Sequence, residues 1–142
     1  MWVLFSEDSL YSLDYLKEFF KNDLFAVKQL GAKIIEAHDD YAKCEIDVLD
    51  IHKNAKGIIM GGAIFTLADF TFAVATNQHE EYATVSTTAN ISYFRPGLGK
   101  KLYAEANKIR DGKTICFYEC NVYDDSNTLI ARVNISGTHI AK

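Results

Sequence analysis

Asp69 is the residue whose chemistry is most informative, because it is the one charged side chain between Ala63 and Ala75. Burying an ionised carboxylate without partners costs several kcal/mol, so the group must be paired, protonated or in contact with a wet cavity. A general base or nucleophile in a cleft is the functional interpretation, since a low-dielectric setting tunes such a carboxylate. A capping or hydrogen-bonded core aspartate is the structural alternative.

A glycine pair, Gly61-Gly62, precedes Asp69 where the apolar stretch should enter a helix. Helix N-termini present unpaired N–H groups and partial positive charge, which suit a developing oxyanion, and glycine lets a carbonyl approach the backbone closely. Close helix packing or a simple turn would also use two glycines. Gly61 and Asp69 would lie about 12 Å apart along one helix, so one chain cannot apply both to one carbonyl. A two-fold dimer, with Asp69 of one subunit facing Gly61 of the other, would form two shared sites.

The hydrophobic pattern predicts the elements that position these residues. Residues 13–30 have approximate helical spacing, broken around Lys21-Asn22-Asp23, and Gly31 is a plausible end. Two strands are expected on either side of His38-Asp39-Asp40, the second alternating over residues 41–48, and the apolar helix should end near Asn77. Four further strands are expected at 83–95, 101–110, 114–124 and 128–139.

This order of elements predicts an α+β fold. Strands joined by short turns, such as the Asp111-Gly112 hairpin, form an antiparallel sheet, here of about six strands. A helix that is apolar nearly all round must be covered on most sides, which one sheet achieves by wrapping around it. The uncovered flank of the helix then invites a second subunit.

Composition narrows the classes of function. The chain has 142 residues, 49% of them apolar, and is expected to form one domain over 1–142 with a sizeable core. Its net charge of −4 argues against nucleic acid as a partner. Residues 58–76 could suggest a membrane span, but Asp69 near the middle and the glycine pair favour a buried helix, so no membrane partner is expected.

Cysteine usage predicts a reducing compartment. Cys44, Cys116 and Cys120 lack metal-ligand spacing, so no metal site is expected and the cytoplasm is the expected location. Cys116 and Cys120 share a parity in a strand-like run, which predicts that both line one face of the sheet.

The run from His52 to Asp69 resembles the signature of hotdog-fold thioesterases, specifically the PaaI (phenylacetyl-CoA thioesterase) type within the 4-hydroxybenzoyl-CoA thioesterase superfamily. It has the pattern H-x-N-x-x-G-x-x-x-G-G, followed by an aspartate eight residues after the first glycine of the pair. Further resemblance covers residues 22–26, 30–31, 92–96 and 137–139, and so most of the chain. The resemblance implies hydrolysis of acyl- or aryl-acyl-CoA thioesters to the free acid and CoA, without a cofactor.

The resemblance also implies roles for individual residues. Asp69 would be the general base or the nucleophile, and the Gly61 N–H would polarise the thioester carbonyl. Asn54 would orient the water or the substrate, unless it only forms a turn. Ser86 would be a polar strand residue near Asp69, with the adjacent Thr87 and Thr88 as alternatives.

Met60 departs from the family pattern, since many relatives carry histidine immediately before the glycine pair. Methionine cannot hydrogen-bond a water as imidazole does. Either that histidine is dispensable, or the rate and the acyl preference have changed in this chain. His52 keeps its place in the family pattern, but as a loop histidine it is expected to be solvated.

The substrate path implied by the resemblance involves residues of the helix start, the last strands and their connections: Met60, Gly62, Ser86, Thr88, Tyr93, Phe94, Arg95, Pro96, Gly97, Leu98, Arg110 and His139. Cations that gather around two successive turns suit the CoA phosphates or merely aid solubility, namely Arg95, Lys100, Lys101, Arg110 and Lys113. The aromatic residues are expected in the core rather than in an acyl pocket: Phe65, Phe70, Phe72, Tyr93 and Phe94.

Two other functions fit the same pattern. A non-catalytic acyl-CoA-binding protein of this fold is the main alternative, because fold does not determine chemistry and Met60 leaves room for lost activity. A hotdog dehydratase or hydratase ranks last, since it would pair a histidine with the carboxylate and none lies on the Asp69 helix. A homodimer that pairs into a dimer-of-dimers tetramer is expected, and the acyl group cannot be read from the sequence.

Overall fold

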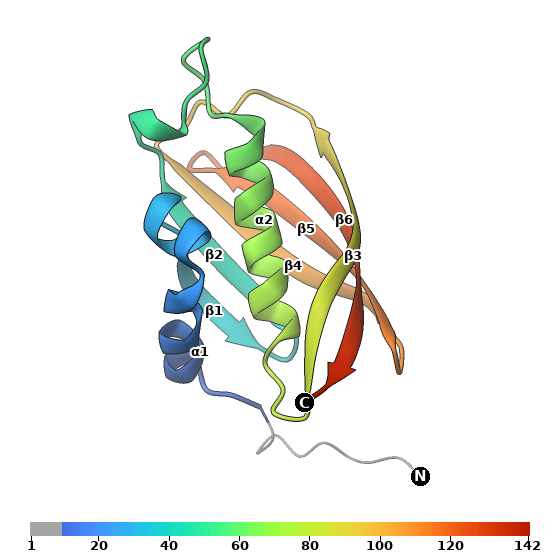
Figure 1. The fold of residues 1–142 in the computed structure, drawn as a ribbon. Coiled ribbons are helices and arrows are strands. Elements are labelled where there is room, and N and C mark those ends of the chain that lie inside the picture. The colour runs from blue at the N-terminus through green and yellow to red at the C-terminus, as the bar shows by residue number, and fades with distance from the viewer. Residues whose placement is uncertain (1–9) are drawn as a thin grey trace.

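The computed structural model describes residues 10–142 (Figure 1). An antiparallel sheet with the strand order β1-β2-β4-β5-β6-β3 packs one face against the long helix α2, Gly61–Thr76. The strands are β1 (Lys33–His38), β2 (Tyr41–Asp47), β3 (Tyr82–Tyr93), β4 (Lys101–Asp111), β5 (Ile115–Asp124) and β6 (Leu129–Ala141). The α+β prediction is confirmed, and the strand ranges expected from the sequence agree with the observed ones to within two residues.

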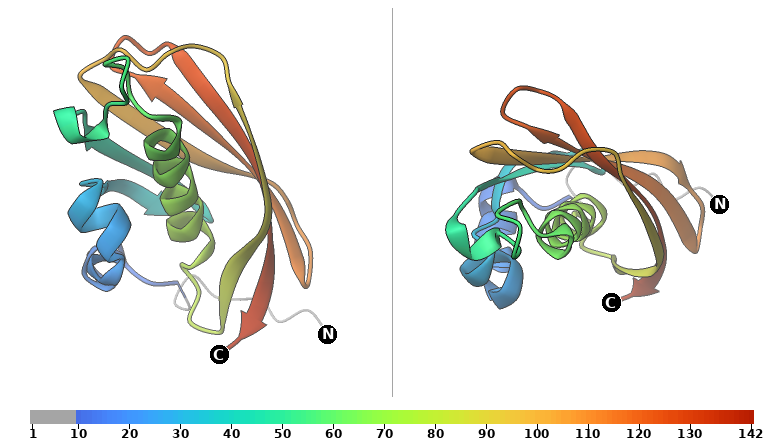
Figure 2. Two further views of the ribbon diagram at one scale, coloured as in Figure 1. Left: turned by 45° about the horizontal axis from the view of Figure 1, so that its top comes forward. Right: turned by 90° about the horizontal axis from the view of Figure 1, so that it is seen from above.

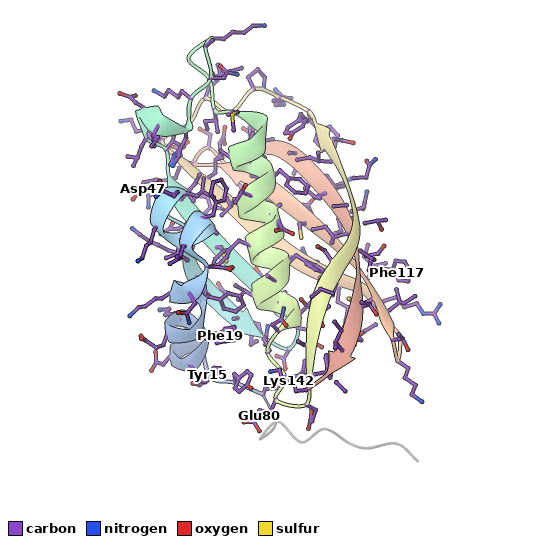
Figure 3. The ribbon with its side chains drawn as sticks, in the orientation of Figure 1. Tyr15, Phe19, Asp47, Glu80, Phe117 and Lys142 are labelled. Carbon is purple, nitrogen blue, oxygen red and sulfur yellow. The ribbon has the colours of Figure 1, made fainter. Side chains whose placement is uncertain are left out.

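Short helices form the layer beside α2 on the side away from β3, as Figure 2 shows. They are α1 (Leu13–Phe19), the 3-10 turn η2 (Phe20–Asn22) and the π-helical segment η3 (Leu24–Gln29). The expected break in this segment is confirmed, because Asp23 leaves helical geometry with φ −79° and ψ 77°. In α1, Leu16 is buried, whereas Tyr15 and Phe19 lie along the outer surface (Figure 3).

Helix α2 is buried over most of its circumference, because the sheet curls around it (Figure 2). Its threonines do not leave unpaired hydroxyls in this apolar setting: Thr71 Oγ1 donates to Leu67 O at 2.7 Å and Thr76 Oγ1 to Phe72 O at 2.8 Å. Within residues 10–142, no helix is long and apolar enough to cross a membrane.

One stripe of α2 is less buried than the rest and contains Gly62, Thr66, Asp69 and Ala73. These positions follow the i, i+4, i+7, i+11 spacing of one helix face. The carboxylate that the sequence analysis singled out therefore lies on the flank of the helix that the sheet does not cover.

The C-terminal end of α2 is fixed to the sheet by two amide side chains. Asn77 Nδ2 donates to Ala73 O at 2.8 Å and to Thr84 O at 3.1 Å, and Asn77 Oδ1 accepts from Thr84 N at 2.9 Å. Buried Gln78 donates from Nε2 to Tyr41 O at 2.9 Å. These bonds set the position of α2 along the sheet, and with it the positions of Asp69 and the glycine pair.

Replacing Asn77 with alanine should destabilise the fold by about 1–3 kcal/mol, because the backbone groups that it satisfies are left unpaired in a partly buried place. Chemical denaturation of the variant measures this loss. Asn107→Ala, at an exposed position of β4, is the matched control and should change stability much less. Equal effects of the two substitutions would contradict the anchoring role of Asn77.

Candidate active site

The Asp69 carboxylate is partly buried and has no hydrogen bond or ion pair to any other residue in the described range 10–142. Burial raises the pKa of this carboxyl above its ordinary value, and the nearby Asp23 carboxyl adds to the rise. Burial also raises the pKa of Asp23, in the break between η2 and η3. Among residues 10–142, Asp69 is therefore neither a capping residue nor a hydrogen-bonded core aspartate. An unpaired carboxylate with a raised pKa suits a base.

The first turn of α2 exposes unpaired backbone donors. The N-cap residue Met60 makes no side-chain capping bond, and the N–H groups of Gly61 and Gly62 have no partner among residues 10–142. Tyr93 Oη donates to Gly61 O at 3.0 Å. A Cβ atom built on Gly61 would lie 2.9 Å from Tyr93 Oη. A side chain at Gly61 would therefore displace the Tyr93 ring. The two N–H groups without partners among residues 10–142 lie at an open helix N-terminus.

Gly61 and Asp69 belong to one uninterrupted helix in the structure. Their separation of eight residues corresponds to about 12 Å at a rise of 1.5 Å per residue. Within one chain, the amide donors and the carboxylate therefore cannot act on the same carbonyl, as the sequence analysis expected.

A pocket of about 320 Å³ lies beside the first turn of α2. It gathers residues from the loop before α2, from α2 itself and from the end of β3, including Asn54, Gly61, Tyr93, Phe94, Arg95, Pro96 and Gly97. The structure thus brings together five residues predicted to lie on the substrate path and two predicted catalytic residues, Asn54 and Gly61. Leu98, the next residue, is largely exposed and does not line the pocket.

The aromatic residues divide between core and surface. Phe70 and Phe72 are buried, as expected, and Phe65 packs partly buried against the core. The expectation that Tyr93 and Phe94 are core residues is wrong, because both are about half exposed. The chain leaves the sheet at the end of β3, so these two rings lie at the mouth of a pocket.

Asn54 has a clear structural part in the loop before α2. Its Oδ1 accepts from Lys56 N at 2.9 Å and from Ile58 N at 3.4 Å, and its backbone N–H donates to Ile58 O at 2.8 Å. The side-chain oxygen is therefore occupied by a turn. The NH₂ group has no partner within the described residues, so the amide retains two donors at the pocket.

The polar residues of β3 are separated by a bulge at Thr87. Ser86 pairs with Gly137 and Thr88 pairs with Ser136. An advance of two residues along β3 is therefore matched by an advance of only one residue along β6. Gly137 faces α2, since a Cβ atom there would meet Phe72 at 2.9 Å. Ser86 therefore faces the α2 side, whereas Thr88 faces the outer side of the sheet, although simple alternation would place both on one face.

Thr88 and Arg110 come together on that outer face. They line a hollow of about 730 Å³ that Phe117 and Ser136 also border. Register explains the grouping, since Thr88 pairs with Ser136, Ser136 with Phe117, and Phe117 with Arg110. Within one chain these two residues lie across the sheet from Asp69.

His139 lies at the opposite end of α2 from Gly61. Its Nδ1 is 2.7 Å from Thr84 Oγ1, its Nε2 is 2.6 Å from Asp111 Oδ1, and Thr84 in turn donates to Thr76 O in the last turn of α2. Gly61 and His139 are therefore separated by about the length of α2, which is about 24 Å for 16 residues.

The expected gathering of five cations is wrong. Arg95, Lys100 and Lys101 lie at one end of β4, whereas Arg110 and Lys113 lie at the other end, in the β4–β5 hairpin (Figure 1). An antiparallel strand of 11 residues separates its two turns by about 34 Å. Lys101 Nζ also lies 3.1 Å from Asp47 and 3.4 Å from Glu45. Successive turns were close in sequence but not in space.

The expectation of a solvated His52 is also wrong. The residue closes the 3-10 turn η4 (Asp50–His52) and is only 6% exposed. It lines a second pocket, of about 310 Å³, on the other side of the first turn of α2. Sequence reasoning missed this pocket, although the H-x-N spacing pointed to His52, because the residues from η3 and η4 that form it are far apart in the chain.

The described residues contain no group of three or more His, Cys, Asp or Glu side chains arranged to hold a metal ion. Cys44, Cys116 and Cys120 are free and buried, and both Cys116 and Cys120 face the core, as the strand parity predicted.

Comparison with known proteins identifies the family. A family model described as Thioesterase superfamily matches residues 56–131, which is more than half of the chain and includes the glycine pair and Asp69. The chain belongs to the thioesterase superfamily. This member is 39% identical over 120 residues to a protein of Archaeoglobus fulgidus whose name describes an esterase, with 83% of this chain and 74% of that protein covered.

The thioesterase-superfamily chain is also 31% identical over 113 residues to the acyl-coenzyme A thioesterase PaaI of Escherichia coli, covering 79% of each chain. The structure of E. coli PaaI superposes with a TM-score of 0.78 at 25% identity, over 91% of this chain and 96% of that chain. The resemblance to PaaI-type hotdog thioesterases is confirmed.

Asp69→Asn should raise the thermal stability of the protein near pH 8 and leave it unchanged near pH 4. The raised pKa means that the fold favours the neutral carboxyl, so the wild type loses stability as pH rises from the ordinary aspartate pKa of about 3.9 through the folded value. An amide has no such loss.

Thermal unfolding at the two pH values measures the difference in Tm between variant and wild type. Asp14→Asn, at an exposed position of α1, is the control for the change of one charge. A lower Tm of Asp69→Asn near pH 8 would mean that the ionised carboxylate is stabilised in the fold.

Proposed function

We propose that this protein is an acyl-CoA thioesterase that hydrolyses acyl- or aryl-acyl-CoA to the free acid and CoA at sites shared between two subunits. The observation that carries the proposal is that α2 holds both a carboxylate and a first turn whose N–H groups have no hydrogen-bond partner among residues 10–142. The family membership and the PaaI relative support the reaction class.

The geometry of α2 supports a shared site. The open stripe of the helix runs through Gly62, Thr66, Asp69 and Ala73, and an antiparallel copy of α2 centred near Thr66 would place Asp69 of the partner subunit opposite Gly62. Strand β3 is an edge of the sheet, 12 residues long and largely exposed from Val85 to Asn90, which offers a backbone template to a second copy.

In the proposed reaction, the N–H groups of Gly61 and Gly62 donate to the thioester oxygen as negative charge develops on it. Asp69 of the partner subunit accepts a proton from water, and the hydroxide adds to the carbonyl carbon. The carbon–sulfur bond then breaks, and the proton passes to the departing CoA thiolate. Direct attack by the carboxylate, with hydrolysis of the resulting anhydride, is the other route open to the same two groups.

The remaining roles follow from position. Asn54 would present its free NH₂ group to the water or substrate, and Ser86 would act from the α2 side of the sheet. Tyr93 to Gly97 would contact the pantetheine arm at the pocket mouth. Thr88, Arg110 and His139 would contact the CoA of a site to which another subunit contributes Gly61. The expected dimer-of-dimers tetramer remains part of this proposal, as does a cytoplasmic location, which the three free thiols support.

Asp69→Asn should lower kcat/KM for acyl-CoA hydrolysis by about 10²- to 10⁴-fold, the usual loss on removing a general base. Release of free CoA from a panel of acyl-CoA esters measures it, with Asp14→Asn as the matched control that retains activity. A non-catalytic acyl-CoA-binding protein is the second candidate function, because position 60 carries methionine and not histidine. Wild-type protein that binds acyl-CoA tightly but releases no CoA would support this second function.

Two inactive variants should complement each other if the site is shared. Asp69→Ala lacks the carboxylate. Gly61→Val places a branched side chain at the first turn of α2, where it displaces Tyr93 and crowds the approach of a carbonyl to the amide donors. When equal amounts are unfolded and refolded together, half of the dimers are mixed, and each holds one intact site of two. About a quarter of the wild-type activity should return. Activity that stays at the level of the separate variants would contradict the shared site.

A further inference from the structure

The Tyr93 side chain joins the end of β3 to the first turn of α2. Its Oη atom donates to Gly61 O at 3.0 Å. Tyr93 is itself held by the sheet, since it pairs with Ala131 of β6. The next residue, Phe94, donates its backbone N–H to Ile130 O at 2.8 Å. The hydroxyl that contacts the glycine pair therefore comes from a part of β3 that its neighbour strand fixes in place.

Strand β3 is bonded to α2 at both ends of the helix. Near the start of β3, the backbone N–H and carbonyl of Thr84 are bonded to the side chain of Asn77, which follows the last turn of α2. At the end of β3, the hydroxyl of Tyr93 is bonded to the first turn. The contact at Tyr93 is thus the one that acts on the turn whose N–H groups have no partner among residues 10–142.

This contact requires glycine at position 61. A Cβ atom built on Gly61 would lie 2.9 Å from Oη and 3.0 Å from Cζ of Tyr93, which is closer than a side chain can approach without displacing the ring. The missing side chain is therefore what gives the hydroxyl access to the carbonyl. Gly61 and Tyr93 form one structural unit, in which the small residue is needed for the contact of the large one.

Gly61 O and the N–H of Gly62 belong to the same peptide group. This peptide is trans, so the two lie on opposite sides of the C–N bond, and a donor on the oxygen leaves the N–H accessible. A hydrogen bond to the oxygen polarises the peptide and makes its N–H a stronger donor. The N–H of Gly62 has no partner among residues 10–142, so this added strength is available to a ligand.

We propose that Tyr93 is a positioning residue, whose hydroxyl holds and polarises the Gly61-Gly62 peptide that receives the negative charge of the thioester oxygen. The inference rests on the proposed thioesterase function and gives the hydroxyl a role separate from the contact of the ring with the pantetheine arm. Strand β3 is also the sheet edge offered to a second copy, so the strand that holds the amide donors also sets their place relative to Asp69 of the partner subunit.

Tyr93→Phe removes the hydroxyl and keeps the ring that lines the pocket. The kcat for acyl-CoA hydrolysis should fall by about three- to tenfold, which is the loss expected for one neutral hydrogen bond. KM should stay within about twofold, because the contacts of the ring remain. Release of free CoA from one ester that the wild type hydrolyses measures both constants.

Tyr118→Phe is the matched control. Tyr118 Oη donates to Asp40 O at 2.7 Å, and its buried ring packs against Phe72, about 16 Å along α2 from Gly61. The substitution removes the same kind of bond away from the first turn, so it should lower Tm and leave kcat and KM within about twofold. A loss of kcat as large as that in Tyr93→Phe would assign both losses to stability and overturn the role.

The sequence allows the effect on the peptide to be observed directly. Gly61-Gly62 is the only pair of adjacent glycines among the eight glycines of the chain. When only glycine carries ¹³C at the carbonyl and ¹⁵N at the nitrogen, the amide of Gly62 alone is coupled to a labelled carbonyl and gives one NMR signal. Both of its frequencies depend on hydrogen bonding to Gly61 O, so the signal should move in Tyr93→Phe and stay in place in Tyr118→Phe.

Each outcome bears on one of the two proposals. A lower kcat together with a moved Gly62 signal supports the role of Tyr93. An unchanged kcat in Tyr93→Phe overturns it and leaves the thioesterase function standing. A lower kcat with an unmoved signal also overturns it, because the hydroxyl then acts on the substrate itself. If the wild type hydrolyses no acyl-CoA ester, the proposed function fails, and the role of Tyr93 in the reaction fails with it.

Discussion

The main constraint on this structure is that helix α2, which is apolar over most of its surface, must be shielded from water although it carries one carboxylate. The strands supply the cover by curling around the helix, and the short N-terminal helices close the side away from β3. Complete enclosure would bury Asp69 without a partner, at a cost of several kcal/mol. The fold reduces this cost by leaving one stripe of the helix open, and the raised pKa of Asp69 shows that burial still disfavours the ionised form.

The first turn of α2 is the second consequence of this arrangement. This helix begins with two glycines and has no side-chain cap, so its first N–H groups have no partner among residues 10–142, and Tyr93 Oη donates to Gly61 O beside them. The turn separates two pockets of similar volume, one lined by the loop after β3 and one by η3 and η4. Amide donors between two cavities suit a substrate that is long on both sides of its reactive carbonyl, as an acyl-CoA is.

Much of the fold could be predicted because its signals are local. Alternation of apolar and polar residues located the strands, turn sequences such as Asp111-Gly112 located the hairpins, and the uniformly apolar stretch located α2. The separation of about 12 Å between Gly61 and Asp69 could also be predicted, because it follows from the helical rise of 1.5 Å per residue and α2 is uninterrupted between them. The cations at the two ends of β4 could not be placed in this way, because residues of two successive turns are close in sequence but are separated by the length of the strand between them.

The sequence by itself determined the carboxylate, the glycine pair and the helix that keeps them apart, since these follow from residue types and a fixed repeat of 1.5 Å per residue. Only the tertiary structure decided which side chains surround these groups and on which side of the sheet each neighbouring residue lies. The bulge at Thr87 sends Ser86 and Thr88 to opposite sides of the sheet. The packing of the elements around the first turn of α2 buries His52, which the sequence predicted to be solvated. Both outcomes depend on contacts between segments distant in the chain, which no local pattern of side chains encodes.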